Sequence, residues 1–199
     1  MNCEKLITNM TDQIKEAQLK LGYAEETVRL YYPLSSLRRL LREDGTDAVG
    51  LSVADAGTVL AALETEFENR ENCPLGKLSF RLHKDRVEIS IPPAGVRYVH
   101  EEVEKPVFLS ALIELFRTKH HCGIEDVRGV FEKFSRDYVC EKLSREAAEH
   151  MGFDYVLYFT DEAKDRYYYC VKEEMGHTVY HRFTKEDYEE FGTAAGPEA

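Results

Sequence analysis

Hydrophobic residues recur at intervals of three and four along the first third of the chain, a spacing that places them on one face of an α-helix. On this pattern the sequence predicts four helices, over residues 3–21, 24–31, 34–41 and 56–67. Ser52 and Asp55 precede the last of these, and both side chains can accept hydrogen bonds from the unpaired N–H groups of a first helical turn. Ser52 with Asp55 three residues later therefore predicts a capping box at the start of the fourth helix.

Alternation of apolar and polar residues replaces the helical spacing between residues 78 and 100. A period of two is typical of strands that bury one face of a sheet. Strands are predicted over residues 78–82, 87–91 and 96–100, with turns at Lys84-Asp85 and Pro92–Gly95. The expected result is an antiparallel meander with one face in water.

The second half of the chain repeats this order of helices followed by strands. Residues 107–116 are apolar nearly all round, which predicts a buried central helix, and Gly123 is expected to end it. A helix is predicted over residues 124–138, and residues 139–150 are also assigned as helical.

A second meander is expected near the carboxyl end. Alternation predicts strands over residues 153–159, 166–172 and 177–183. Thr184 with Asp187 then predicts a capped short helix that ends at Phe191. The fold class is therefore α+β: one domain over residues 1–191, with helices packed on an antiparallel sheet of about six strands built from two three-strand meanders. Residues 192–199 are expected to form a flexible tail.

Composition and charge narrow the classes of partner. The 199 residues carry 26 Lys and Arg against 37 Asp and Glu, a net charge of −11. Such a chain is repelled by phosphate backbones and anionic lipid, so neither a nucleic acid nor a membrane is expected as its partner. Its five cysteines are scattered without a C-x-x-C pair, and residues 1–22 carry alternating charges rather than an apolar signal. Free thiols in a cytoplasmic protein are the expectation.

Motifs of common enzyme classes are missing from the sequence. It contains no G-x-G-x-x-G, G-x-x-x-x-G-K-[ST], G-x-S-x-G or H-E-x-x-H. This favours a non-catalytic module that binds an unknown protein or small molecule, and no cofactor is expected. Two chemical alternatives stay open, a cysteine–histidine enzyme and a zinc protein.

The zinc hypothesis depends on His120, His121 and Cys122, three consecutive residues that could join Cys140 or His150 around a metal ion. Consecutive residues on a helix point about 100° apart, which makes a shared metal difficult. The alternative is structural, since cationic side chains in the last turn of a helix favour the negative end of its dipole.

The enzyme hypothesis depends on Cys170 and His181, with Tyr168 nearby. If Met175-Gly176 is a two-residue turn, Cys170 lies directly opposite His181, near enough for an imidazole to activate the thiol. If the turn spans residues 173–176, His181 instead faces Tyr168. A buried, unreactive thiol beside a core histidine is the alternative.

The binding hypothesis depends on one face of the last three strands. We expect this face to be the open one, and the thiol side, with Tyr155, Leu157 and Phe159, to be core. An aromatic face with polar tips can stack on a ligand or contact a partner. The alternative is that helices cover it. Its predicted members are Val156, Tyr158, Tyr167, Tyr169, Thr178, Tyr180 and Arg182.

Overall fold

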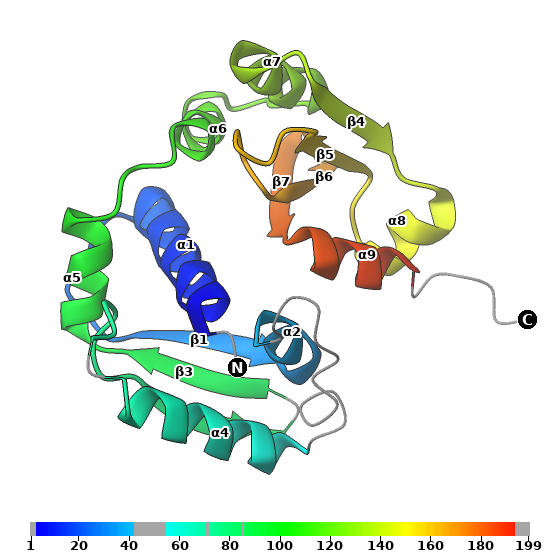
Figure 1. Cartoon of the computed structure of the whole chain (residues 1–199). Coiled ribbons are helices and arrows are strands. Elements are labelled where there is room, and N and C mark those ends of the chain that lie inside the picture. Colours follow the sequence, from blue (N-terminus) through cyan, green and yellow to red (C-terminus); the bar gives the residue numbers. More distant parts are fainter. Residues whose placement is uncertain (1–2, 42–54, 71, 85, 194–199) are drawn as a thin grey trace, which may run out of the picture. The chain divides into compact units, whose positions relative to one another are not determined.

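Two separate antiparallel sheets, each with its own helices, organise the chain (Figure 1). The computed structural model describes residues 3–41, 55–70, 72–84 and 86–193. One sheet lies in a unit formed by Met1–Lys105 and the other in a unit formed by Pro106–Ala199. The α+β class is confirmed, but a sheet of three strands and a sheet of four replace the single six-stranded sheet. The single domain over residues 1–191 stays a prediction.

The first unit builds its sheet in the order β1-β3-β2, with antiparallel neighbours throughout. Its elements are α1 (Cys3–Leu21), β1 (Val28–Pro33), α2 (Leu34–Leu40), α4 (Ala56–Glu68), β2 (Ser79–His83), β3 (Arg86–Ile91) and α5 (Pro93–Glu101). Asp55 was predicted as the second member of a capping box, but it is itself the N-cap of α4, since its side chain accepts a hydrogen bond from the Thr58 N–H. Ser52 lies outside the described residues.

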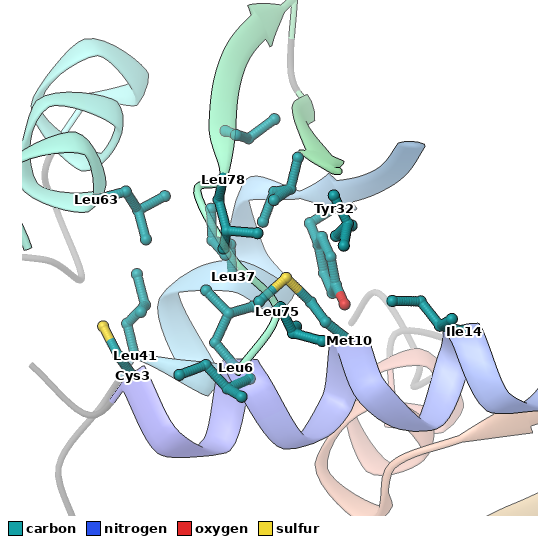
Figure 2. Packing of buried hydrophobic residues seen from close by; sticks show 14 of the residues in the cluster. Cys3, Leu6, Met10, Ile14, Tyr32, Leu37, Leu41, Leu63, Leu75 and Leu78 are labelled. Atoms are coloured by element: carbon teal, nitrogen blue, oxygen red, sulfur yellow. The ribbon is translucent and has the colours of Figure 1, made fainter. Parts of the chain in front are cut away.

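The core of the first unit covers one face of this sheet. Val87, Ile89 and Ile91 alternate along β3 and are fully buried. Helices supply the opposing layer, and Figure 2 shows side chains of α1 pointing toward residues of the other elements. The labelled members from the helices are Cys3, Leu6, Met10, Ile14, Leu37 and Leu63, and Leu41 is the C-cap residue of α2. Because the apolar residues of β3 share one face, the other face is left with polar side chains.

Two segments of the first unit differ in secondary structure from the prediction. A helix was predicted over residues 24–31, but residues 28–33 form β1. This strand pairs with β3, and its alternate residues lie opposite the buried residues of β3. Residues 96–100, predicted as a strand, belong to α5, which begins after Pro92. Val96 and Val99 are both buried, and their separation of three is a helical period.

The second unit forms a meander in the order β4-β5-β6-β7. Its elements are α6 (Val107–Thr118), α7 (Ile124–Phe134), β4 (Tyr138–Lys142), α8 (Arg145–Met151), β5 (Tyr155–Phe159), β6 (Tyr168–Glu174), β7 (His177–Phe183) and α9 (Lys185–Thr193). Residues 192 and 193 thus belong to a helix, and the rest of the predicted tail lies outside the described residues. Within the described ranges, no helix combines the length and apolar character needed to cross a membrane.

The additional strand β4 was missed by the sequence analysis. The helix predicted over residues 124–138 ends at Phe134, where Ser135 adopts an extended conformation. Tyr138 to Lys142 then pair with β5, although residues 139–150 were expected to be helical throughout. Pairing with a neighbouring strand supplied by the fold therefore outweighs a weak local pattern.

Phe108 is the centre of the core in the second unit. Its ring is 4% exposed and contacts aromatic rings from α7, β5 and β6. Ring centroids lie 4.6 Å away at Phe131, 5.4 Å at Phe134, 4.8 Å at Phe159 and 5.3 Å at Tyr169. These edge-to-face contacts fasten α6 and α7 to one face of the sheet.

We expect Phe108→Ala to lower the free energy of unfolding of the second unit by about 3–5 kcal/mol, because it removes a ring from a fully packed cluster. Val107→Ala is the matched control, since Val107 is the preceding residue of α6 and is 72% exposed. Its expected effect is below about 0.5 kcal/mol. Urea unfolding followed by circular dichroism measures both, and equal effects would contradict the central role of Phe108.

Gly95 provides a second test of the fold. A Cβ atom there would lie 2.9 Å from the Ile91 side chain and would clash with the Leu75 carbonyl group. Gly95→Ala should therefore destabilise the first unit by about 1–3 kcal/mol. In Gly129→Ala, within α7, the added methyl meets nothing within 4 Å. That variant should gain up to about 1 kcal/mol from helix propensity. Unchanged stability of Gly95→Ala would contradict the close approach at Gly95.

Candidate functional site

The β6–β7 hairpin has the register that places Cys170 opposite His181. Glu174 pairs with His177, and Met175-Gly176 forms the two-residue turn between them. Both turn residues have positive φ, 52° and 80°, as a type I′ turn requires. This confirms the predicted pairing and excludes the four-residue turn.

The two faces of the second sheet are divided differently from the prediction. Leu157 pairs with Tyr169, and Val156 pairs with Cys170. Tyr158 therefore shares a face with Cys170, whereas the sequence analysis grouped it with Tyr169. The loop between β5 and β6 is too long to define a register from its residue types, and a shift of one position reverses every side chain.

Helices α6 and α7 cover the face that carries Tyr167, Tyr169 and Tyr180. Tyr169 is fully buried and Tyr167 is 7% exposed. These phenols were predicted to face outward. They face inward because the large apolar side of α6 needs an aromatic layer to pack against. Phe116 stacks on Tyr180 at 5.2 Å between centroids.

Polar groups on this covered face are partnered internally. Burial raises the pKa of Tyr169 well above its ordinary value, and its hydroxyl donates a hydrogen bond to Asp165 at 3.0 Å. The guanidinium of Arg182 lies over the Tyr167 ring at 4.3 Å. Of the seven residues predicted for the binding face, Tyr167 and Tyr169 are therefore core residues, and Tyr180 and Arg182 are half-buried packing residues.

Cys170 and His181 are neighbours in different surroundings. Cys170 is fully buried, and burial raises the pKa of its thiol to about 12. His181 is exposed on the edge strand β7. Tyr168 is the third residue of the enzyme hypothesis. Its ring stacks on the ring of Tyr158 and on the ring of Tyr188. At neutral pH a thiol in such surroundings stays protonated and is a poor nucleophile.

The residues of the zinc hypothesis follow the end of α6. The helix ends before them, with Lys119 as its C-cap. His120 and His121 are exposed, while Cys122 is buried and its thiol has a pKa raised by burial. Within the described ranges, no group of three or more His, Cys, Asp or Glu side chains is placed to hold a metal ion.

Gly123 has a different role from the one predicted. It is the N-cap of α7 instead of the end of α6, and its N–H donates a hydrogen bond to the Asp126 carboxylate at 3.0 Å. The hydrogen bonds from Lys119 and the Gly123 N–H lower the pKa of Asp126. Capping of α7 therefore accounts for the glycine at position 123.

A pocket of about 220 Å³ opens where β5 ends and β6 begins. The loop between these strands and the first residue of α9 complete its walls. The lining residues are Tyr158, Phe159, Thr160, Glu162, Asp165, Arg166, Tyr168 and Lys185. Tyr158 and Tyr168 are the members that the sequence analysis had already named.

Stacked tyrosines form the aromatic wall of this pocket. The rings of Tyr158 and Tyr168 lie 4.1 Å apart at 17°, and Tyr188 of α9 stacks on Tyr168 at 5.0 Å. Burial raises the pKa of Tyr158 and of Tyr168, and raises that of Tyr188 to about 12. The phenols therefore remain neutral hydrogen-bond donors at physiological pH.

Charged residues of both signs surround the wall. Asp165 is engaged within the protein, because it accepts from the Tyr167 N–H and the Tyr169 hydroxyl. Glu162, Arg166 and Lys185 are exposed. The Thr160 hydroxyl donates to the Asp137 carbonyl. The arrangement can stack a small ring and pair with a charged group, and it presents no activated nucleophile.

Sequence reasoning missed Glu162, Arg166 and Lys185 as members of this site. Each lies in a loop or at a helix start, and they meet only after the hairpin returns the chain to the end of β5. The run Arg166-Tyr-Tyr-Tyr was the available signal. Because alternate tyrosines of a strand face opposite ways, Tyr168 is the one tyrosine of that run that lines the pocket, together with Arg166.

Alkylation rates test the thiol environment. In the native protein we expect iodoacetamide to modify Cys170 at least about 100-fold more slowly than the half-buried Cys140, because both access and ionisation are suppressed at Cys170. Peptide mass spectrometry after timed quenching measures both sites. In denaturant the two rates should converge. Fast modification of native Cys170 would contradict this and support the hypothesis of a cysteine–histidine enzyme.

Comparison with curated proteins found no match, and comparison with solved structures found none either. One family model matches residues 3–192, and its description is "Domain of unknown function, E. rectale Gene description (DUF3877)". The match spans both sheets and the pocket. The chain therefore belongs to the DUF3877 family.

Proposed function

We propose that this protein is a non-catalytic binding module whose pocket beside Tyr158 and Tyr168 takes a small molecule with a planar ring and a carboxylate. The observation that carries this proposal is the stacked pair of tyrosines in the wall of a pocket with cationic residues at its rim. Aromatic walls with a few polar groups are typical of small-molecule sites.

The size of the pocket supports a single-ring ligand. Its volume of about 220 Å³ is below the roughly 300–1,000 Å³ of pockets for drug-sized molecules. Because the Tyr168 ring is stacked on both Tyr158 and Tyr188, offset stacking of one ligand ring is possible on Tyr158, with the Tyr168 hydroxyl as a hydrogen-bond donor. A larger ligand would extend past the rim.

Lys185 supports the choice of a carboxylate. It is exposed, lies at the start of α9 and lines the pocket. Arg166 adds a second cation, whose guanidinium also lies 5.4 Å from the Tyr167 ring centre. Two acids, Asp165 and Glu162, also line the pocket, and Asp165 is already engaged by the Tyr167 N–H and the Tyr169 hydroxyl. A carboxylate is therefore preferred over an ammonium group.

Phenylacetate tests this proposal, because it joins one ring to one carboxylate. In protein carrying ¹³C-labelled tyrosine, we expect it to shift the ring signals of Tyr158 and Tyr168 with a millimolar Kd. Benzyl alcohol, which has the ring alone, and acetate, which has the carboxylate alone, should bind more weakly. Unchanged Tyr158 and Tyr168 signals at about 10 mM phenylacetate would overturn the proposal.

Lys185→Gln separates the two parts of the ligand. We expect it to weaken phenylacetate binding at least about threefold and to leave benzyl alcohol unaffected, because only the carboxylate loses a partner. Lys164→Gln is the matched control. It removes the same charge from an exposed residue of the β5–β6 loop that does not line the pocket. Equal effects of both variants would indicate general electrostatics rather than a site.

A further inference from the structure

The outer face of the first sheet carries a charged cluster that the pocket does not use. Along the middle of this face, Tyr31 of β1, Glu88 of β3 and Arg81 of β2 lie directly opposite one another. Arg29 and Ser90 form the next pair on one side, and Arg86 and His83 form the next pair on the other. These residues point away from the face that Val87, Ile89 and Ile91 bury.

Glu88 is a buried carboxylate at the centre of this open face. It is 6% exposed, although Tyr31 is 52% exposed and His83 is also exposed. His83 Nε2 lies 2.9 Å from Glu88 Oε2, the Ser90 hydroxyl donates to Oε1 at 3.3 Å, and Arg29 Nε is 3.7 Å from Oε1.

These partners explain why a carboxylate is tolerated there. Burial raises the pKa of Glu88, but hydrogen bonds from Tyr31, Ser90 and His83 more than offset this and lower the pKa below its ordinary value. Glu88 therefore stays ionised and holds the side chains around it in place. It acts as a positioning residue for the face.

The face has a surplus of positive charge. Arg29, Arg81 and Arg86 stand against the one carboxylate of Glu88. Arg81 and Arg86 are exposed, and neither forms an ion pair with another described residue. The chain as a whole carries −11, so this cationic area contrasts with the surrounding charge.

We propose that this face docks an acidic, extended segment of a partner protein, with its carboxylates on Arg81 and Arg86 and its backbone or side chains against Tyr31. Arginine binds carboxylates in a bidentate geometry, and arginine and tyrosine are enriched among the residues that dominate protein interfaces. A sheet face is broad, whereas small-molecule sites are concave.

Net charge favours a peptide over a nucleic acid. A continuous phosphate backbone is repelled by the overall charge of −11, while a segment with a few carboxylates is repelled much less. Tyr31, which is hydrogen-bonded to Glu88, also loses little freedom on binding, which reduces the entropic cost of association.

Fluorescence anisotropy with the full chain tests this site. The probe is a fluorescein-labelled peptide of about nine residues that alternates glutamate with serine, so that its carboxylates lie on one side of a strand. We expect binding at about 0.05 M salt that weakens at about 0.3 M. The same peptide with glutamine for glutamate should not bind. Absence of binding by the acidic peptide would overturn the proposal.

A matched pair of double variants locates the binding. Arg81→Gln with Arg86→Gln should weaken the peptide Kd at least about tenfold. Arg117→Gln with Arg136→Gln removes the same charge from exposed residues of the second unit and should change the Kd less than about twofold. Equal losses in both double variants would overturn the site. Tighter binding of an oligothymidylate of about nine residues would overturn the choice of a peptide.

Glu88→Gln distinguishes positioning from charge alone. The substitution makes the face more positive, so electrostatics alone would tighten the binding of the acidic peptide. If Glu88 positions Tyr31 and His83, binding should weaken at least about threefold despite the added positive charge. Tighter binding would overturn the assignment of Glu88 as a positioning residue.

Discussion

Covering the apolar face of a β-sheet is the constraint on which both units of this protein depend. A sheet has two faces, and a face rich in Val, Ile, Phe or Tyr is stable only when a second layer excludes water from it. In the second unit, Phe108 provides that layer by joining α6 and α7 to β5 and β6 through four ring contacts. In the first unit, the helices pack onto Val87, Ile89 and Ile91, the alternate residues of β3 that share one face of the sheet.

The same constraint determines which side chains remain available for binding. Tyr169 is used to complete a core, so its hydroxyl is partnered by Asp165 within the protein. Tyr168, the preceding residue, points to the other face and contributes to a pocket. In the first sheet, Val87 and Ile89 are core, and Glu88 between them organises an open polar face. Neighbouring residues of one strand thus face the core and the opposite side of the sheet in turn.

Proximity and reactivity are separate properties, as Cys170 and His181 illustrate. Their cross-strand pairing follows from a turn that can be identified in the sequence, and the hairpin has that register. The environment of the thiol depends on its burial between layers, which keeps it protonated. A pairing deduced from a turn therefore locates two groups without determining their chemistry. The pocket shows the reverse case. No local sequence pattern groups Glu162, Arg166 and Lys185, and the path of the β5–β6 loop and the following hairpin brings them to one site.

Local patterns in the chain were sufficient for most helices, the β2–β3 and β6–β7 hairpins and the helix cap at Asp55, because each depends on residues close in sequence. They failed where a segment such as Val28–Pro33 or Tyr138–Lys142 became a strand through pairing with a partner that the pattern does not name. They also failed for the orientation of Tyr158 and Tyr169, because a shift of one residue between β5 and β6 reverses the faces. Only the folded chain decided how many sheets form and which tyrosines reach solvent, since both depend on which layers compete to cover each apolar face.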